Sequence, residues 1–204
     1  MEDAHSTLSA TFHLTHACNL RCGYCYTGEK FNLGMSAEVA DRGVDFAIAE
    51  ARKSGAGHLE VVFFGGEPLL RMDLIRRVCD RTTERAASLE VSFKTSTNGL
   101  LLDEPTLMDL AARQVYIAVS VDGDPETQDA QRPDAAGQGT SARLAPALDR
   151  LLAYNPCANV TCVCPPEGAG RLDHSVRWLF ERGFAYVTVA FAWNAPWTAE
   201  DLDV

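Results

Sequence analysis

The sequence alternates between segments with the two-residue periodicity of a β-strand and segments with the periodicity of an amphipathic helix. Strand patterns cover residues 8–14, 59–64, 91–95, 115–120, 158–163 and 186–191. Helical patterns lie between Ser36 and Gly55 and over residues 70–86, 104–112, 141–153 and 173–182. Residues 121–140 contain Pro125 and Pro133 and are expected to form a polar loop. Parallel strands joined by helices need right-handed crossovers. We therefore expect an α/β fold, a partial (β/α)6 barrel of parallel strands over residues 8–193.

Two terminal segments fall outside the expected barrel. Residues 1–7 are expected to form an N-terminal tail. In residues 194–204, Thr198 is a good helix N-cap and is followed by acidic residues, as at the start of a helix. A helix of one turn buries little apolar surface. We therefore expect residues 194–204 to be the start of a truncated C-terminal extension.

Composition and charge exclude some classes of protein. No run of about 18 apolar residues occurs, so no membrane span or membrane partner is expected. The N-terminus lacks the charged and then apolar layout of a signal peptide, which predicts a cytoplasmic protein. The sequence has 28 acidic and 18 basic residues, a balance that argues against nucleic-acid binding. The acidic excess favours solubility, or else a basic peptide partner.

Three of the seven cysteines lie within eight residues, at Cys18, Cys22 and Cys25. In a reducing compartment such clustering is typical of metal binding rather than of disulfides. Thiolates suit an iron–sulfur cluster, and three of them leave one iron of a cubane open for a chelating ligand. The alternative is a zinc site completed by His16 or another cysteine. The uneven spacing, with the aromatic residue Tyr24 before the last cysteine, favours the cluster.

The segment Cys18-Asn-Leu-Arg-Cys22-Gly-Tyr-Cys25 resembles the C-x3-C-x-aromatic-C signature of the radical SAM superfamily. This resemblance implies a radical SAM type of barrel and a [4Fe-4S] cluster held by the three cysteines. It also implies S-adenosylmethionine (SAM) as the ligand of the open iron. By the same resemblance, Tyr24 shields the cluster and touches the adenine of SAM.

Other strand ends carry segments that resemble those of the same family. Gly65-Gly66-Glu67-Pro68 is similar to the GGEP segment that meets the SAM amino group, and two glycines also let the backbone approach a ligand closely. The alternative is a plain glycine turn. Thr97-Asn98-Gly99 is similar to a TNG segment, in which Asn98 faces the cavity, although Asn-Gly is also a common turn dipeptide.

The fourth strand ends in Ser120 and Asp122, which share one face with a period of two. The resemblance assigns both residues contacts near the ribose or carboxylate of SAM. The segment from Gln128 to Arg132 is similar to an H-D-x-x-R segment, in which Arg132 pairs with the SAM carboxylate. The alternative for Arg132 is an ordinary surface position. Gln128 stands where this segment usually has histidine.

The remaining cysteines carry a weaker signal. Cys162 and Cys164 point the same way from one strand, and they are either core residues or, with Cys157, ligands of an auxiliary cluster. Cys79 lies in the apolar stripe of a helix and is expected in the core.

The set of motifs is most similar to the branch that contains anaerobic sulfatase-maturating enzymes and maturases of ribosomal peptides. The resemblance implies an enzyme in which SAM is cleaved to methionine and a 5′-deoxyadenosyl radical. That radical takes hydrogen from a peptide or protein side chain, with a one-electron reductant of the flavodoxin or ferredoxin type as partner. Members of this branch usually carry a C-terminal SPASM or twitch domain with auxiliary clusters, and we expect this sequence to lack that domain. No catalytic base is assigned.

The alternatives are a radical SAM enzyme acting on a small metabolite, or a truncated non-catalytic module that binds a metal or a partner.

Overall fold

A computed structural model describes residues 6–202 of the chain. Most of the expected N-terminal tail, residues 1–5, lies outside the described residues, and so do residues 203–204 of the expected C-terminal extension. Residues 200–202 form a short 3-10 helix, η3 (Glu200–Leu202), in which the Asp201 carboxylate accepts from the Thr198 backbone N–H at 2.7 Å. No helix within residues 6–202 is both long and apolar enough to cross a membrane.

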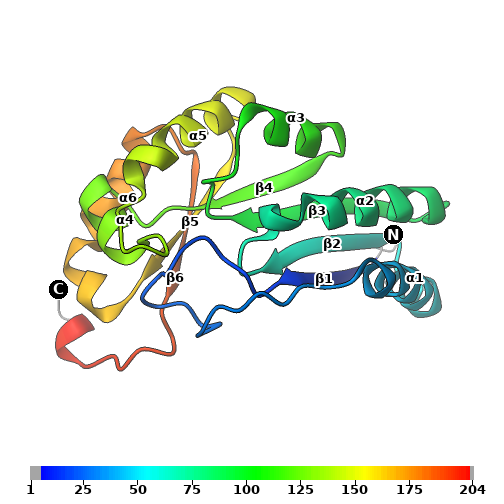
Figure 1. Cartoon of the computed structure of the whole chain (residues 1–204), viewed down its shortest axis with the longest axis horizontal. Helices are drawn as coiled ribbons and strands as arrows, with labels where there is room; N and C mark the ends of the chain where they lie inside the picture. Colours follow the sequence, from blue (N-terminus) through cyan, green and yellow to red (C-terminus); the bar gives the residue numbers. More distant parts are fainter. Residues whose placement is uncertain (1–5, 203–204) are drawn as a thin grey trace, which may run out of the picture. The chain divides into compact units, whose positions relative to one another are not determined.

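The described chain alternates strands and helices as the periodicity predicts (Figure 1). The strands are β1 (Thr7–Thr15), β2 (His58–Gly65), β3 (Glu90–Thr97), β4 (Val115–Ser120), β5 (Asn159–Cys164) and β6 (Tyr186–Phe191). The α-helices are α1 (Ala37–Ser54), α2 (Met72–Arg85), α3 (Glu104–Ala112), α4 (Pro125–Gln131), α5 (Ser141–Tyr154) and α6 (Leu172–Glu181). Two further 3-10 helices are η1 (Pro68–Arg71) and η2 (Pro166–Arg171). The strand order is β1-β2-β3-β4-β5-β6, which confirms the expected α/β sheet.

Contacts between residues divide the chain into two compact units. The first comprises the described part of Met1–Cys18 together with Lys30–Ser96 and Pro105–Tyr116. The second comprises Asn19–Glu29, Thr97–Glu104 and the described part of Ile117–Val204. The boundary after Cys18 falls inside the three-cysteine loop, so the loop begins in one unit and continues in the other.

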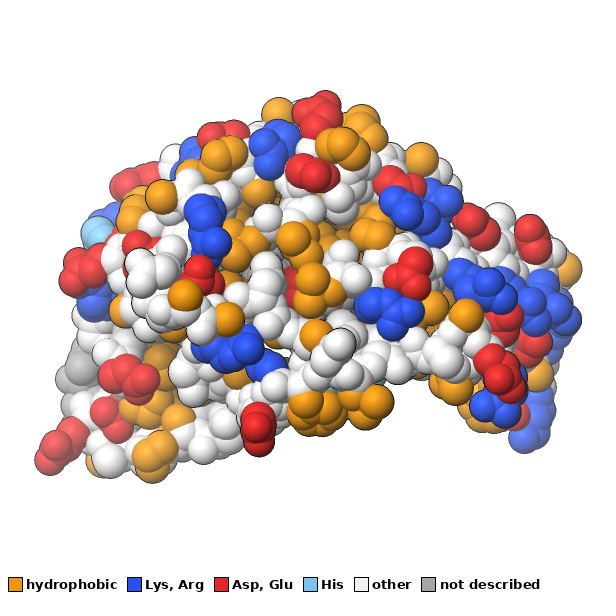
Figure 2. Space-filling model, in the orientation of Figure 1, with side chains coloured by type: hydrophobic (Ala, Val, Ile, Leu, Met, Phe, Trp, Pro, Cys, Tyr) orange, Lys and Arg blue, Asp and Glu red, His pale blue; other side chains and the backbone are white. Residues whose placement is uncertain are grey.

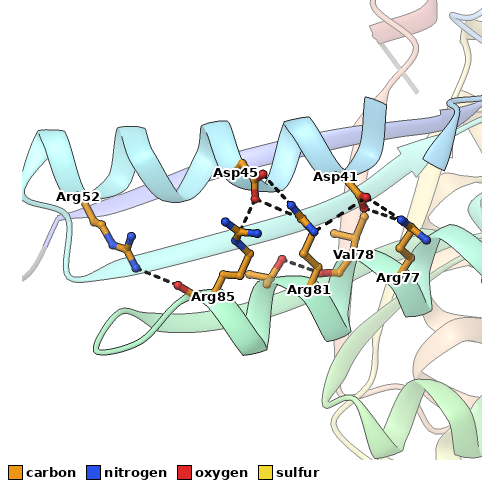
Figure 3. Close-up of polar contacts among 8 residues, drawn as sticks. Asp41, Asp45, Arg52, Arg77, Val78, Arg81 and Arg85 are labelled. Carbon is orange, nitrogen blue, oxygen red and sulfur yellow. Dashed lines mark hydrogen bonds and ion pairs between the residues drawn. The ribbon is translucent and has the colours of Figure 1, made fainter. Parts of the chain in front are cut away.

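The first unit contains the parallel pairs β1–β2 and β2–β3, with α1 and α2 side by side (Figures 1 and 3). Alternate strand residues such as Leu59, Val61 and Phe63 are buried, and so is the α1 stripe that includes Val44 and Ile48. Burial of these apolar faces is the main stabilising contribution to the unit.

Helix α1 begins and ends where its sequence predicts. The Ser36 hydroxyl accepts a hydrogen bond from the Val39 backbone N–H at 3.2 Å, as an N-cap does. Gly55 takes a left-handed conformation with φ of 72°, and its N–H bonds the carbonyls of the last turn.

The second unit contains the parallel pairs β4–β5 and β5–β6, with helices α4, α5 and α6. Val160, Cys162 and Cys164 of β5 are buried on one face of the sheet. Leu148 of α5 and Leu179 of α6 are also buried and belong to the apolar stripes of these helices.

The prediction of a polar loop over residues 121–140 was wrong in part, because this segment contains helix α4. Asp124 caps the helix: its Oδ1 accepts from the backbone N–H groups of Glu126 at 2.9 Å and Thr127 at 3.1 Å. Pro125 occupies the first turn, where its missing N–H costs nothing. The proline that suggested a loop is therefore part of a helix start.

An ionic ladder joins α1 to α2 on the surface of the first unit. Asp41 and Asp45 project from α1 toward Arg77, Arg81 and Arg85 of α2 (Figure 3). Arg77 forms a two-bond pair with Asp41, at 2.7 and 2.6 Å, and Arg81 forms one with Asp45, at 3.2 and 2.7 Å. Basic and acidic side chains accordingly alternate over the α2 side of the molecule (Figure 2).

The ladder gives the first unit a defined pH dependence. Hydrogen bonds from Arg77 and Arg81, acting against partial desolvation, lower the pKa of Asp41 and of Asp45 below the ordinary value. A carboxylate whose pKa is lowered by folding stabilises the native state above its unfolded pKa, and this contribution is lost as pH falls through the folded pKa.

We expect the double substitution Asp41→Asn and Asp45→Asn to lower the thermal midpoint at pH 7 and low salt. The difference from wild type should narrow as pH falls from about 4, because the wild-type carboxylates become protonated as pH passes through their lowered folded pKa. Thermal unfolding followed by circular dichroism from pH 7 to pH 2.5 measures it. A difference that stays constant down to pH 2.5 would contradict the assignment.

Candidate functional site

In the first unit, the start of the three-cysteine loop lies against the glycine pair that follows β2. The Gly66 N–H donates to the Thr15 carbonyl at 2.7 Å, and the Glu67 N–H donates to the Ala17 carbonyl at 2.9 Å. A Cβ on Gly66 would lie 2.2 Å from the Ala17 oxygen, and Gly65 has a φ of 132°. The glycines are therefore required by a close approach of the chain to itself, in addition to any approach to a ligand.

Glu67 is buried beside this contact and caps the short helix η1. Glu67 is only 1 % exposed, and its Oε1 accepts a hydrogen bond from the Leu69 backbone N–H at 3.0 Å. The cap fixes the carboxylate at the end of β2, where the sequence predicts a group that attracts an ammonium.

In the second unit, the next part of the loop pairs with the segment that follows α4. Leu20 and Asp134 form an antiparallel bridge. The Arg21 N–H donates to the Pro133 carbonyl at 2.8 Å, and the Gly23 N–H donates to the Gln131 carbonyl at 3.2 Å. Cys22 therefore lies between two residues whose backbones are fixed.

Asn98 forms the turn that the sequence left open, and it also bonds the cysteine loop. Its Oδ1 accepts from the Leu100 N–H at 3.1 Å, which forms the turn after β3, and Gly99 has a φ of 80°. Its Nδ2 donates to the Oδ1 of Asn19 at 2.8 Å. Asn98 thus also fixes the residue that follows Cys18.

A buried network joins Tyr24 of the loop to Asp122 and Arg132. The Tyr24 hydroxyl donates to Asp122 Oδ2 at 2.6 Å, and Arg132 Nη2 donates to Asp122 Oδ1 at 3.0 Å. Arg132 Nε lies 2.9 Å from Asp122 Oδ2, and the guanidinium carbon lies 5.4 Å from the centre of the Tyr24 ring. The Asp122 side chain is fully buried and that of Arg132 is 7 % exposed, so Arg132 is not the surface residue that the sequence left open.

Burial and charge set the protonation of this network. Burial raises the pKa of Tyr24 above its ordinary value, so the phenol keeps the proton that it donates to Asp122. Burial by itself lowers the pKa of Arg132, but the charge of Asp122 acts in the opposite direction, and the pKa of Arg132 stays raised. The guanidinium is therefore charged.

Gln128, at the position where the resembling segment has histidine, is a buried structural residue. Its Oε1 accepts from the Asp122 backbone N–H at 3.0 Å, and its Nε2 donates to the Thr140 hydroxyl at 3.3 Å. Thr140 in turn donates to the Arg132 carbonyl at 2.8 Å. Gln128 thus holds the backbones at Asp122 and Arg132 together, which an amide does with one acceptor and one donor.

Three further residues lie near these contacts: Ser120 in β4, Asn19 in the cysteine loop and Gln131 at the end of α4. Ser120 is half-buried at the last position of β4. Asn19 and Gln131 were missed from the sequence, although Asn19 lies within the cysteine motif and Gln131 directly precedes Arg132. The sequence signal that could have found them is that each lies next to a residue recognised from a motif. Their hydrogen-bond partners could not be predicted, because these depend on tertiary contacts.

The remaining cysteines are mostly core residues. Burial raises the pKa of Cys79 and of Cys162 to about 12, and it also raises the pKa of Cys164. The Cys162 thiol donates to the Asp122 carbonyl at 3.3 Å. These neutral, buried thiols agree with the core interpretation, whereas Cys157 is exposed.

The three thiols of the loop are all half-buried, which suits a group that must be sheltered from water and yet reach a soluble ligand. Within residues 6–202, no three His, Cys, Asp or Glu side chains surround one ion position. A cubane cluster needs no such arrangement, because each thiolate binds a different iron. The donor set therefore fits the cluster.

The chain matches the family model described as "Radical SAM superfamily" over residues 12–179. It therefore belongs to the radical SAM superfamily, whose members use a [4Fe-4S] cluster and SAM.

Curated relatives and solved structures resemble the chain. A cysteine-type anaerobic sulfatase-maturating enzyme of Clostridium perfringens is 24% identical over 175 residues, which are 83% of this chain and 47% of the relative. The mycofactocin maturase MftC of Mycobacterium ulcerans is 31% identical over 167 residues, 80% of this chain and 42% of the relative. A solved structure of native anSMEcpe with bound AdoMet and Kp18Cys peptide has a TM-score of 0.83 at 22% identity, covering 96% of this chain and 57% of that one. This likeness confirms the expected radical SAM type of fold, and the chain spans about half the length of the relatives it matches.

We expect Gly66→Ala to destabilise the first unit by about 3 kcal/mol, because the new Cβ would meet backbone that cannot easily move. Gly23→Ala is the matched control, since a Cβ there meets nothing within 4 Å. It should change the free energy of unfolding by less than about 1 kcal/mol. Urea unfolding of both variants measures the contrast, and equal effects would contradict the close approach.

We expect iodoacetamide at pH 8.5 to label Cys157 in the native protein and to label Cys79 and Cys162 only after unfolding. A thiol with a pKa of about 12 has almost no thiolate at that pH, and burial also blocks the reagent. Peptide mass spectrometry after timed labelling measures the rates. Native labelling of Cys79 as fast as that of Cys157 would contradict the core assignment.

Proposed function

We propose that this chain carries the radical-generating part of a radical SAM enzyme that modifies a peptide or protein side chain. Cys18, Cys22 and Cys25 would hold the [4Fe-4S] cluster. Once bound, the reduced cluster would supply the one electron that cleaves SAM to methionine and a 5′-deoxyadenosyl radical, and that radical would take hydrogen from the substrate. The observation that carries the proposal is the fixed path of the loop at Arg21 and Gly23, on both sides of Cys22.

The chain's own residues supply the contacts that SAM needs. Arg132 donates to Asp122 through Nη2, and the other edge of its guanidinium has donors that match a carboxylate. We assign this edge to the SAM carboxylate. Glu67, with the backbone of Gly65 and Gly66, takes the SAM ammonium.

Three further residues complete the proposed SAM site. Ser120, at the end of β4, faces the ribose or carboxylate, and Asn98 faces the same ligand from the turn after β3. Tyr24 shields the cluster and meets the adenine.

The comparisons favour a peptide or protein substrate. Two of the similar proteins are maturases by name, and the solved structure contains a peptide together with AdoMet. A one-electron reductant of the flavodoxin or ferredoxin type would reduce the cluster.

We expect anaerobic reconstitution with iron and sulfide to give about four irons per chain and an absorbance band typical of [4Fe-4S] clusters. Dithionite and SAM should then yield 5′-deoxyadenosine and methionine. Cys22→Ala should lose the cluster, because a cubane with only two protein thiolates is poorly held. Cys157→Ala is the matched control and should keep it, since Cys157 is an exposed cysteine outside the loop.

Two outcomes would contradict the proposal. One is a wild-type chain that gains no cluster, or that gains one and does not cleave SAM. The other is a cluster retained by Cys22→Ala, which would exclude the assigned ligand. If product formation rises with a small metabolite and not with peptides, the substrate is a small metabolite and not a peptide.

A further inference from the structure

The Asp122 carboxylate has no acceptor site left for a ligand. Its Oδ1 accepts from Arg132 Nη2 at 3.0 Å and from the Val163 N–H at 2.9 Å. Its Oδ2 accepts from the Tyr24 hydroxyl at 2.6 Å and, with the Gln131 amide nitrogen directed at it, from Gln131 at 3.0 Å. A carboxylate offers about four lone-pair sites, and these four donors fill them.

These four donors come from three different parts of the second unit. Tyr24 belongs to the three-cysteine loop, Gln131 and Arg132 end α4, and Val163 lies in β5. One fully buried carboxylate thus joins the loop to the strand and helix that surround it.

The backbone of Asp122 is fixed as firmly as its side chain. Gln128 accepts from its N–H at 3.0 Å, and its carbonyl accepts from the Cys162 thiol at 3.3 Å. The carboxylate is therefore held in place independently of the loop, and it can set the position of Tyr24.

We infer that Asp122 is a positioning residue, which sets the path of the Cys22–Cys25 segment through Tyr24 and orients Arg132, and does not itself touch SAM. This differs from the SAM contact expected for Asp122 from the family resemblance. The inference rests on the proposed function, because only a cluster on this loop gives its path a catalytic consequence.

The test is Tyr24→Phe, which removes only the hydroxyl that reaches Asp122. A hydrogen bond to a charged group is lost, so amide hydrogen exchange of residues 21–25 in the cluster-free protein should become about tenfold faster. The electron paramagnetic resonance spectrum of the reduced cluster should also change before any SAM is added. Tyr154→Phe is the matched control, because Tyr154 is 48% exposed at the end of α5, and it should change neither measurement.

Asp122→Asn and Ser120→Ala separate positioning from direct contact with SAM. A positioning residue alters the SAM-free spectrum, so Asp122→Asn should shift it. A residue that only touches SAM alters the SAM-bound spectrum alone, as we expect for Ser120→Ala. If Asp122→Asn does not fold, Tyr24→Phe decides the question.

The inference is overturned if Tyr24→Phe matches wild type in loop exchange and in the SAM-free spectrum. It is also overturned if a folded Asp122→Asn differs from wild type only after SAM is added. Failure of the proposed function is a different result, because the wild-type chain would then gain no cluster. The exchange measurement uses cluster-free protein, so it would still test the hydrogen bond between Tyr24 and Asp122.

Discussion

The second unit depends on one buried ion pair, that of Asp122 with Arg132. Removing two charges from water costs several kcal/mol for each ion, and the attraction between them offsets this only when the remaining donors and acceptors are satisfied. Here the carboxylate has four donors, and Tyr24, Gln131 and Val163 supply three of them. All the acceptor sites of the carboxylate are therefore filled only when the loop, the end of α4 and β5 are all in place. This mutual requirement makes the local structure specific.

The start of the three-cysteine loop is held by a different kind of interaction. Gly65 and Gly66 have no side chains, so their backbone reaches the Thr15 and Ala17 carbonyls. This contact uses backbone hydrogen bonds and steric exclusion, with no buried charge. The two parts of the loop thus respond to different perturbations: added volume disturbs the first, and loss of a polar partner disturbs the second.

The strands and most helices were predictable from the sequence because their residues obey simple periodicities. Burial along β2 and β5 alternates as the pattern indicates, and Ser36 and Gly55 bound α1 as capping rules require. Helix α4 was missed because Pro125 was interpreted as a loop residue, while Asp124 before it signalled a helix start. The start of such a helix depends on whether the N-cap residue or the proline that follows it is given more weight.

The residue types of the candidate site were also predictable, but their partners were not. Asp122, Arg132 and Tyr24 were each recognised from a motif, and nothing in their spacing indicates that they bind one another. Gln128 illustrates the same limit, since its two hydrogen bonds join residues that are six and twelve positions away. Such contacts follow from the tertiary fold.

The anchors described for the loop in the second unit use the residues between the cysteines. Asn19, Arg21, Gly23 and Tyr24 contact the protein through an amide, two backbone N–H groups and a phenol. None of these anchors uses a thiol, so the path of the loop is set by groups that an iron atom would not displace. Thiolates that bind a cluster would therefore leave these described anchors in place. Preorganisation of ligands lowers the entropic cost of binding a metal group. The residues between the cysteines therefore matter for the chemistry as much as the spacing that they create.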